Sequence, residues 1–502
     1  MSIPAILSVD EGTTGTRAAW VTADGSVHGT EYRPLGVSSP RAGVVEQDAN
    51  LILSRTIDAC RTVIARASAE DVHLVGMAIA SQRCTAVLWD LQTGTAIVPA
   101  MVWQDSRYAE ELAARGPAWD DFLIPRVGRA TGVRSPYLWA AHHLRETAEV
   151  AEAYRDKRLG FGTIDTWLLW SLTRERTYAT TSTNATSSGA YRLADHSYQS
   201  SWIEELGFPA DLLPELRQDA DHLGTTDSER LGISVPVLAA IGDQHAGTLG
   251  LGCLRQGQAM CVHGTGSFVD LVTGTELPKN PGLHEGALTL TAWRRRNQSM
   301  YAVESFTATT GSALNWACGT LNWFDSAEMI STLAATVSSA NGVMFIPALT
   351  GLRTPVIEPK VRASLTGMAT STTRAEVAFA ILDGIAQSVA TSIQSAEEVA
   401  GTPVSEVVVG GGLSASDTLV QLQADLTGLP MRRLPASDKA SLRGAAFLAG
   451  SEGLLWDSLE DAVATIGEGV SFEPGTSPAD RVERREAWQA RVDSEVRLVR
   501  NK

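Results

Sequence analysis

The sequence contains few cysteines, and their spacing matches no common metal or redox motif. Only five are present in 502 residues, and none forms a C-x-x-C pair. A small, odd number of separated cysteines fits reduced thiols in a cytoplasm. The amino terminus, "MSIPAILSVD", has no basic region and leads directly into a strand pattern, so we expect no signal peptide. No apolar run reaches eighteen residues, so no membrane span is expected.

Positive charge is also scarce. The chain has 41 lysines and arginines against 57 aspartates and glutamates, a net charge of −16. Because nucleic-acid binding needs a basic face, a nucleic-acid partner is not expected. The length exceeds what a single core accommodates and predicts two domains of roughly 250 residues, or three smaller ones.

Several common catalytic motifs are missing. The sequence has no G-x-x-x-x-G-K-[ST] phosphate loop, no H-E-x-x-H zinc motif and no G-x-S-x-G nucleophile elbow. These absences argue against a Walker-type nucleotidase, a zinc protease and a serine hydrolase. Any phosphate chemistry must therefore use another kind of loop.

Two glycine-threonine bends, Gly12–Gly15 and Gly264–Ser267, each lie between two predicted strands. A tight bend turns several backbone N–H groups inward and makes a concave anion site, to which threonine hydroxyls add donors. Arg17 follows the first bend, and its guanidinium can contact phosphate oxygens. The pair of bends predicts nucleotide-phosphate binding.

Two carboxylates accompany these bends. Asp10 ends the first predicted strand, where it would hold Mg²⁺ or, alternatively, cap the bend as an Asx turn. Asp243 ends the apolar strand of segment 235–252. A carboxylate at a strand end in a cleft can accept the proton of an attacking hydroxyl.

The two bends also belong to a weak internal duplication. Segment 74–82, "LVGMAIASQ", and segment 406–416, "EVVVGGGLSAS", are both β-rich runs that end on small residues. Each half of the chain would then supply one tight loop and one strand-to-helix loop. Segment 177–193 is polar and turn-rich and is expected to be a loop or an irregular region.

Two long helices are predicted in the second half. Thr373 and Glu376 form a capping box before a helix that runs to about residue 400, and Gly401 ends it. The spacing of apolar residues in segment 480–500 predicts an amphipathic surface helix. Its docking residues would be Val482, Trp488, Val492 and Val496.

Eight segments resemble, in order, the motifs of the FGGY family of carbohydrate kinases and span nearly the whole chain. They are "LSVDEGTTGTRA", "SQRCTAVLWD", "AMVWQDSR", "GTIDTWLLWSLT", "GDQHAG", "HGTGSF", "PALTGLRTPVIEPKVRASLTGM" and "VVVGGGLSASDTLVQLQAD". Within the family, the spacing and the "SQR" and "WQD" elements are most similar to glycerol kinases. The resemblance implies a two-domain, actin-like ATPase (ribonuclease H-like) α/β fold with mixed sheets and a cleft between domains 1–250 and 251–502.

The resemblance also implies ATP and Mg²⁺ as cofactors, a hinge near 245–255 and a role for each matching residue. The phosphate-binding residues would be Thr13, Thr14, Arg17 and Thr265, and the other nucleotide contacts Gly311, Asn315, Gly411 and Ser416. Asp10 and Asp243 match metal positions, and Asp243 also matches the catalytic base. The substrate-binding positions would be Arg83, Cys84, Trp103, Tyr137, Asp243, Gln244 and Phe268.

Some positions depart from that pattern. Cys84 stands where glycerol kinases have a glutamate that grips a terminal hydroxyl, and cysteine is a poor acceptor. Glycerol would then bind weakly, or a longer substrate such as a tetritol or keto sugar would fit. Asn315 and Ser416 replace a glutamine and an asparagine, and ATP binding is expected to survive. Glu11 replaces a glutamine and is expected to add negative charge near the metal.

The expected function is ATP-dependent phosphorylation of a primary hydroxyl of a short polyol, glycerol or a close relative. The alternatives are a xylulose- or ribulose-type kinase on the same fold, a non-catalytic sugar and nucleotide sensor, and a chaperone-type ATPase. The expected partner is a small-molecule polyol or sugar. A homodimer or a homotetramer is the expected assembly, in the cytoplasm.

Overall fold

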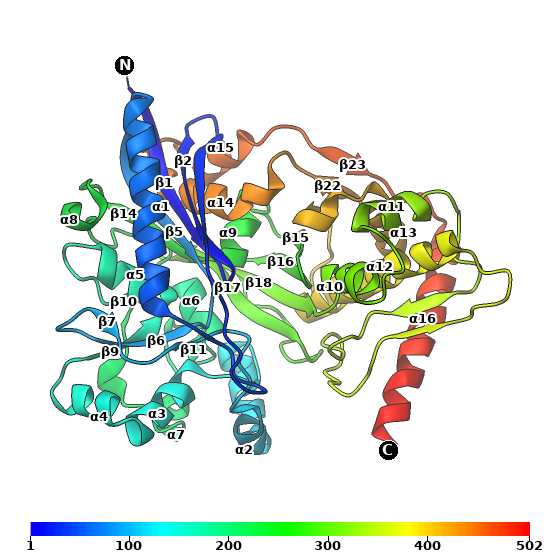
Figure 1. The fold of residues 1–502 in the computed structure, drawn as a ribbon, viewed down its shortest axis with the longest axis horizontal. Coiled ribbons are helices and arrows are strands. Elements are labelled where there is room, and N and C mark those ends of the chain that lie inside the picture. Colours follow the sequence, from blue (N-terminus) through cyan, green and yellow to red (C-terminus); the bar gives the residue numbers. More distant parts are fainter. Residues whose placement is uncertain (1, 502) are drawn as a thin grey trace.

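The computed structural model describes residues 2–501 and is built on two large mixed sheets (Figure 1). The first has five strands in the order β14-β5-β1-β2-β3. Its strands are β1 (Ile3–Glu11), β2 (Gly15–Thr22), β3 (Val27–Pro34), β5 (Val72–Ser81) and β14 (Val237–Gly242). β1 pairs antiparallel with β2 and parallel with β5.

The second sheet has seven strands in the order β17-β18-β16-β15-β21-β22-β23. They are β15 (Gln258–His263), β16 (Ser267–Gly274), β17 (Ala287–Arg295), β18 (Gln298–Thr307), β21 (Glu406–Gly410), β22 (Met431–Arg433) and β23 (Val470–Phe472). β15 pairs antiparallel with β16 and parallel with β21.

The two sheets repeat one local topology. In each, a hairpin (β1-β2 or β15-β16) has a parallel neighbour on one side, β5 or β21, and a further antiparallel strand on the other, β3 or β18. The glycine-threonine bends are the turns of these two hairpins. The predicted internal duplication is therefore confirmed as a repeat of topology, with β5 and β21 as the matching strands.

Smaller sheets and the helices surround this pair. A further sheet joins β4 (Glu46–Gln47), β6 (Ala86–Asp90), β7 (Thr95–Ala96), β8 (Ala100–Met101) and β9 (Leu159–Thr163). Two-stranded pairs are β10 (Ala179–Thr181) with β13 (Glu215–Arg217), β11 (Tyr191–Arg192) with β12 (Ser197–Tyr198), and β19 (Met344–Ile346) with β20 (Ser364–Thr366).

The helices of the first half are α1 (Ala49–Ala69), α2 (Ala109–Val127), α3 (Pro136–Glu146), α4 (Ala148–Arg155), α5 (Ile164–Leu172), α6 (Ser182–Ser187), α7 (Ser200–Glu205), η1 (Ala210–Leu212), α8 (Ser228–Leu231) and α9 (Asp243–Gly250). Those of the second half are α10 (Gly311–Asn315), η2 (Trp316–Thr320), α11 (Ala327–Ala334), α12 (Arg374–Ala400), η3 (Gly412–Ala415), α13 (Asp417–Thr427), η4 (Ser437–Lys439), α14 (Ala440–Gly450), α15 (Leu459–Ala464) and α16 (Pro478–Arg500).

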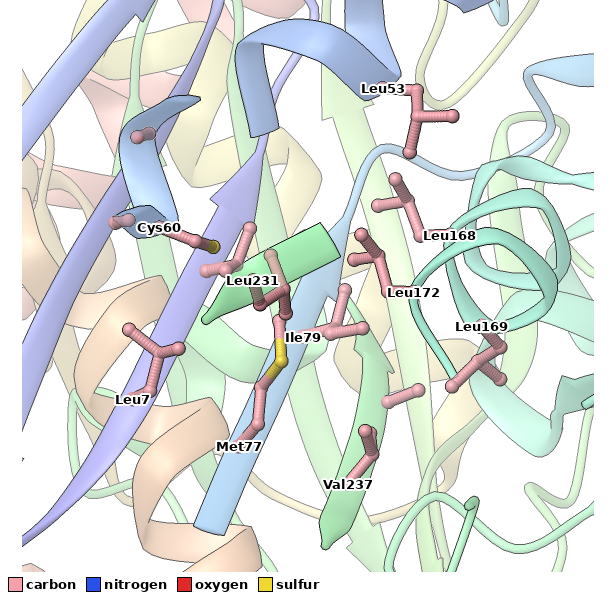
Figure 2. Packing of buried hydrophobic residues seen from close by; sticks show 14 of the residues in the cluster. Leu7, Leu53, Cys60, Met77, Ile79, Leu168, Leu169, Leu172, Leu231 and Val237 are labelled. Carbon is pink, nitrogen blue, oxygen red and sulfur yellow. The ribbon is translucent and has the colours of Figure 1, made fainter. Parts of the chain in front are cut away.

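Alternating residues of β1 face two different cores, as the two-residue period of a strand requires. Leu7 belongs to one core, which it shares with Cys60 of α1, Met77 of β5 and Leu168 of α5 (Figure 2). Ile6 lies on the other face, in a core that α9 and α14 share with residues of both sheets. The helices α9 and α14 therefore lie between the two sheets.

These two central helices cross at a backbone-to-backbone contact. A Cβ added to Gly250 would lie 1.9 Å from the carbonyl oxygen of Ala440, and one added to Gly444 would lie 1.8 Å from that of Ala246. Both positions require glycine because any side chain would separate the helices. α14 comes from near the end of the chain, and Ser8 of β1 donates a hydrogen bond to its Leu442 carbonyl at 2.7 Å.

The long helix α12 forms as predicted. Its capping box joins Thr373 and Glu376, and Gly401 ends it in the left-handed conformation. By length and composition α12 is the one helix of residues 2–501 that could cross a membrane, but 83% of its apolar window is buried inside the fold.

Two local predictions need correction. Segment 177–193 is not a surface loop, because β10 and α6 fall within it and their residues are buried. Val482 does not dock the C-terminal helix, since it is 53% exposed. Trp488 and Val492 are buried in a small core, and Val496 packs against it.

Candidate active site

The first bend is held in place by side chains from elsewhere in the chain. The backbone N–H of Gly12 donates to the carbonyl of Gly15 at 3.2 Å. The Thr13 hydroxyl accepts a hydrogen bond from the indole Nε1 of Trp103 at 2.8 Å, and its carbonyl accepts one from Gln47 at 2.7 Å. Thr14 is exposed at the tip. The bend is a rigid concave loop with one threonine side chain free.

A charged pair lies at the base of this bend. Asp10 and Arg17 are direct partners across β1 and β2, with Arg17 Nη1 3.3 Å from Asp10 Oδ2. Burial raises the pKa of Asp10, and the Arg17 guanidinium opposes that rise. Arg17 keeps 46% of its side chain exposed, so it remains free to contact a phosphate.

The sequence predicted that Glu11, next to Asp10, adds negative charge near the metal, and the structure does not favour this. Its carboxylate is fully buried and accepts hydrogen bonds from Thr16 and Thr56. Burial raises the pKa of Glu11 to about 8, and its second oxygen has no partner among residues 2–501. At neutral pH the side chain is therefore a protonated acid and adds no negative charge.

The second bend is held by backbone groups of α10. The N–H groups of Thr310 and Ser312 donate to the carbonyl of Thr265 at 3.1 Å, and that of Gly311 donates to Gly264 at 3.1 Å. A Cβ on Gly311 would lie 2.4 Å from the Gly264 carbonyl oxygen, so this contact requires glycine. Thr265 itself is exposed, and its hydroxyl is free of hydrogen bonds among the described residues.

Asp243 begins helix α9 at the end of β14. Its Oδ1 accepts the N–H of Gln244 at 2.8 Å and lies 3.6 Å from Nε of Arg83. Burial raises the pKa of Asp243 to about 6, the nearby Arg83 opposes this, and the charge of Asp10 adds to it. A partly exposed carboxylate with a pKa close to neutrality suits a general base.

Arg83 is anchored by a residue that sequence reasoning missed. Its Nη2 lies 2.5 Å from Oε2 of Glu304 on β18, so the arginine joins both halves of the chain. Asp270 is the cross-strand partner of Glu304, and it is buried with one oxygen unpartnered among residues 2–501. Burial and the Glu304 charge raise the pKa of Asp270. The sequence did contain a signal for these two residues, because Asp270 and Glu304 each interrupt an otherwise largely apolar strand, β16 and β18.

The predicted apolar walls do meet. The rings of Trp103 and Phe268 lie 6.3 Å apart, edge to face, although they come from opposite halves of the chain. Tyr137 is buried in a separate aromatic group with Phe161 and Phe208. Burial raises the pKa of the Tyr137 hydroxyl, so the tyrosine stays protonated.

Cys84 is buried at the end of β5. Its backbone is left-handed, with a φ of 63°, which non-glycine residues rarely adopt. Its thiol donates to the carbonyl of Ser187. The thiol is therefore directed at the C-terminal end of α6, and the side chain presents no carboxylate to a substrate.

The remaining predicted nucleotide positions lie near the second bend. Gly411 has a φ of 81°, and a Cβ there would lie 2.2 Å from the carbonyl oxygen of His263. Asn315 is exposed at the end of α10. The Ser416 hydroxyl caps α13 and accepts a hydrogen bond from Ser331 at 2.7 Å, so it is already engaged.

The donor set fits a divalent cation that is shared with a phosphate. Asp10 and Asp243 present two carboxylates, and no group of three or more ligating side chains exists within residues 2–501. Mg²⁺ is commonly bound by one or two carboxylates together with substrate phosphates and water. Two carboxylates beside two anion-binding bends satisfy that requirement.

Comparison with known proteins agrees with this arrangement. The model for the FGGY family of carbohydrate kinases, N-terminal domain, matches residues 5–250, and the C-terminal domain model matches residues 259–452. The glycerol kinase of Acinetobacter baylyi is 32% identical over 492 residues, covering 96% of this chain and 97% of its own. That of Deinococcus radiodurans is 32% identical over 494 residues, covering 97% and 96%.

Solved structures share the fold. Plasmodium falciparum glycerol kinase with ADP superposes with a TM-score of 0.91 at 23% identity, covering 98% of each chain. A ligand-bound xylulose kinase from Lactobacillus acidophilus gives a TM-score of 0.84 at 17% identity, covering 99% of this chain and 98% of its own. The expected fold class is confirmed, and the chain is a member of the FGGY family of carbohydrate kinases.

Proposed function

We propose that this kinase transfers the γ-phosphoryl group of ATP to a primary hydroxyl of a short polyol, glycerol or a close relative such as a tetritol. The observation that carries the proposal is Asp243, a partly exposed carboxylate held beside Arg83 in the neighbourhood of Asp10. The glycerol kinases that this chain resembles over nearly its full length support the choice of substrate class.

In this reaction Asp243 accepts the proton of the acceptor hydroxyl while the hydroxyl oxygen bonds to the γ-phosphorus. The bond between that phosphorus and the bridging oxygen breaks, and ADP leaves. Such transfers depend chiefly on positioning and charge neutralisation, and a base contributes about 10²–10⁴ in rate. The pKa of about 6 leaves Asp243 mostly ionised and ready to act at neutral pH.

The bends would hold the phosphates. Backbone N–H groups of Gly12–Gly15 and Gly264–Ser267, the hydroxyls of Thr14 and Thr265, and the guanidinium of Arg17 are the donors on offer. Asp10 and Asp243 would hold Mg²⁺, which neutralises phosphate charge when bound. Gly311, Asn315 and Gly411 would contact the rest of the nucleotide beside the second bend.

The substrate would lie between the Trp103 and Phe268 rings, with Arg83, Gln244 and Tyr137 around its hydroxyls. Closure of domain 1–250 against domain 251–502 would exclude water from the transfer. The boundary falls at the end of α9, where the Gly250 and Gly444 backbones cross.

One observation favours a second acceptor class. Cys84 leaves the far end of the pocket without the carboxylate that glycerol kinases have, so a ketopentose of the xylulose or ribulose type remains the alternative. Discrimination that rests on one hydrogen bond to a hydroxyl reaches about 10⁴–10⁵, so this single position can change the substrate.

The test is ADP release by the purified protein with ATP and Mg²⁺ across glycerol, erythritol, both threitols, xylulose, ribulose and a blank. A polyol is expected to give the highest kcat/KM. A keto sugar at the top would replace the polyol proposal with the alternative. The Cys84→Glu variant should raise glycerol activity relative to the tetritols, and an unchanged ratio would show that residue 84 does not select the substrate.

A further inference from the structure

Three arginines near the proposed acceptor site have no carboxylate partner. Arg129 follows α2, Arg134 precedes α3, and Arg353 lies in the loop after β19. Within residues 2–501, none of them forms an ion pair. This contrasts with Arg83, whose charge is balanced by Glu304 and Asp243.

Two other arginines, the buried Arg443 and the half-buried Arg485, show one form of a structural role. Arg443 donates to the carbonyl of Gly250 through two nitrogens, at 2.9 and 2.7 Å, and to that of Pro435 at 3.3 Å. Arg485 donates to four acceptor atoms on α12. These two guanidiniums are bonded through several donors to protein acceptors, as buried donors generally are. Arg55 and Arg294 also have a buried Nε without a partner among residues 2–501, so Arg129 and Arg134 are distinguished by their positions beside Cys84 and Trp103.

The three arginines fall short of that standard. Arg129 makes one hydrogen bond, to the carbonyl of Ser187 at 2.9 Å. Arg134 and Arg353 make none with the described residues, and Nε of Arg134 is buried without a partner. All three side chains are half-buried, so water satisfies them only in part. Most of their donors remain available to an anion.

Their positions connect them to the substrate pocket. The Ser187 carbonyl that receives Arg129 also receives the thiol of Cys84. Arg134 lies over the ring of Trp103, with its guanidinium carbon 5.8 Å from the ring centroid. Arg129 therefore marks the Cys84 end of the pocket, and Arg134 marks its aromatic wall.

The positive charge of Arg134 also acts on the other two arginines of the cluster. The charge of Arg134 lowers the pKa of Arg129 and that of Arg353, in addition to the lowering caused by burial. Like charges that share a cleft are unfavourable until an anion separates them. The cluster is unexpected in a chain whose net charge is −16, which by itself repels anions.

From this geometry we infer that the acceptor substrate carries a carboxylate at the end opposite the phosphorylated hydroxyl, bound by Arg129 and Arg134 with Arg353 adding positive potential. The substrate class is a short polyhydroxy acid with a terminal primary hydroxyl, four or five carbons long. This inference rests on the proposed kinase function and names its acceptor more closely. Cys84 fits the same picture, because a glutamate there would repel the carboxylate.

The chemical step is unchanged. The primary hydroxyl loses its proton to Asp243, its oxygen bonds to the γ-phosphorus, and the bond to the bridging oxygen breaks to release ADP. The carboxylate remains ionised and untouched throughout. Arginine is suited to this task because its planar fork binds a carboxylate through two parallel hydrogen bonds.

The test compares acids with neutral chains of the same length: erythronate with erythritol, threonate with threitol, and glycerate with glycerol. ADP release is measured with ATP and Mg²⁺ in the full-length protein. We expect kcat/KM to be higher for a four-carbon acid than for its polyol by about 10-fold or more, as a charge-assisted bidentate contact gives. This comparison uses the native chain and depends on no variant folding.

The arginine assignment is tested by the ratio of acid to polyol kcat/KM in Arg134→Gln and Arg129→Gln. Each should lower that ratio about 10-fold or more. Arg126→Gln is the matched control, because Arg126 is an exposed arginine on the last turn of α2. Since the ratio is taken within one preparation, partial misfolding of the Arg129 variant does not affect it.

The other outcomes overturn parts of the account separately. Preference for neutral polyols or keto sugars would overturn the acid inference and leave the kinase proposal intact. Acid preference in wild type with an unchanged acid-to-polyol ratio in both variants would overturn the arginine assignment. If kcat/KM also fell equally for acids and polyols, the arginines would act on the transferred phosphoryl group instead. No stimulation by any compound would overturn both proposals.

Discussion

The two glycine-threonine bends have the same backbone setting and different chemistry. Beneath each lies a buried polar pair across the hairpin: Thr16 donates to Glu11 under the first bend, and Ser267 bonds His263 at 2.8 Å under the second. These pairs occupy equivalent positions in the two ladders, Glu11 opposite Thr16 and His263 opposite Ser267. The duplication therefore preserved a polar support for each bend.

The ladders diverge one residue pair further from the bend. There the first hairpin has Asp10 opposite Arg17, a charged pair suited to metal and phosphate. The second has Val262 opposite Phe268, whose ring meets that of Trp103 and which we propose as a substrate wall. The comparison shows that a repeated scaffold can keep its folding interactions while adjacent positions take on different tasks.

The largest expected difference between the bends concerns the glycines that lie in or against them, Gly12 in the first bend and Gly311 of α10 against the second. Gly311→Ala should displace the second bend, because its Cβ would lie 2.4 Å from the Gly264 carbonyl oxygen. Overpacking of this kind costs about 1–3 kcal/mol, and we expect the KM for ATP to rise at least about 10-fold. Gly12→Ala should have little effect, because its nearest neighbour atom lies at 3.4 Å. Equal effects in steady-state kinetics and chemical unfolding would contradict the contrast.

The charged pair Asp10–Arg17 has no counterpart at the second bend, and we expect it to contribute to ATP binding at the first. Arg17→Gln removes an exposed guanidinium that is available to phosphate, and kcat/KM for ATP should fall about 10- to 100-fold, the value of a charge-assisted hydrogen bond. Arg192→Gln is the control, because the Arg192 side chain is 41% exposed and also pairs with an aspartate, Asp195. A value for Arg17→Gln within threefold of wild type would remove Arg17 from the phosphate site.

The polar supports should differ in their response to acid. Burial lowers the pKa of His263 to about 4, so the folded protein holds it neutral. Its contribution to stability is complete above an unfolded pKa near 6.5 and is lost as pH falls toward 4. From pH 7 to pH 5, wild type should lose about 2 kcal/mol of unfolding free energy more than His263→Gln does. Parallel pH curves from urea unfolding would disprove this.

The smallest effects concern the two threonines. Thr13→Val should cost about 1 kcal/mol of stability, because it leaves the indole N–H of the half-buried Trp103 without its acceptor. Thr265→Val should leave stability unchanged, since its hydroxyl is exposed and unbonded, while weakening ATP binding a few-fold. Thermal unfolding and nucleotide titration of both variants separate the two roles, and a reversed pattern would contradict the assignment.

Local patterns predicted much of this molecule. The hairpin strands, both bends, the α12 capping box and the match of β5 to β21 all follow from short-range periodicity and turn chemistry. The prediction failed where the secondary structure and burial of a segment depend on long-range packing. Segment 177–193 is polar yet buried, because its hydroxyls bond within the fold, as Thr183 does with Asp219 at 2.6 Å.

The site was predicted in the same uneven way. Asp10, Arg17 and Asp243 lie next to recognisable turns or strand ends, so their sequence context made them candidates, and their roles stay predictions. Glu304 was missed because it reaches Arg83 only through the pairing of β16 with β18 in the other half of the chain. The unpaired state of Arg134 is likewise a property of three-dimensional contacts, which no local pattern records.

The central claim is that Asp243 is the base for phosphoryl transfer between the two bends. The most direct measurement is acceptor-stimulated ADP release by Asp243→Asn against wild type, with Asp121→Asn, at an exposed carboxylate, as the control. The account predicts a kcat lowered by about 10²–10⁴ with the melting temperature preserved. A folded Asp243→Asn protein that retains kcat within about threefold of wild type would contradict it.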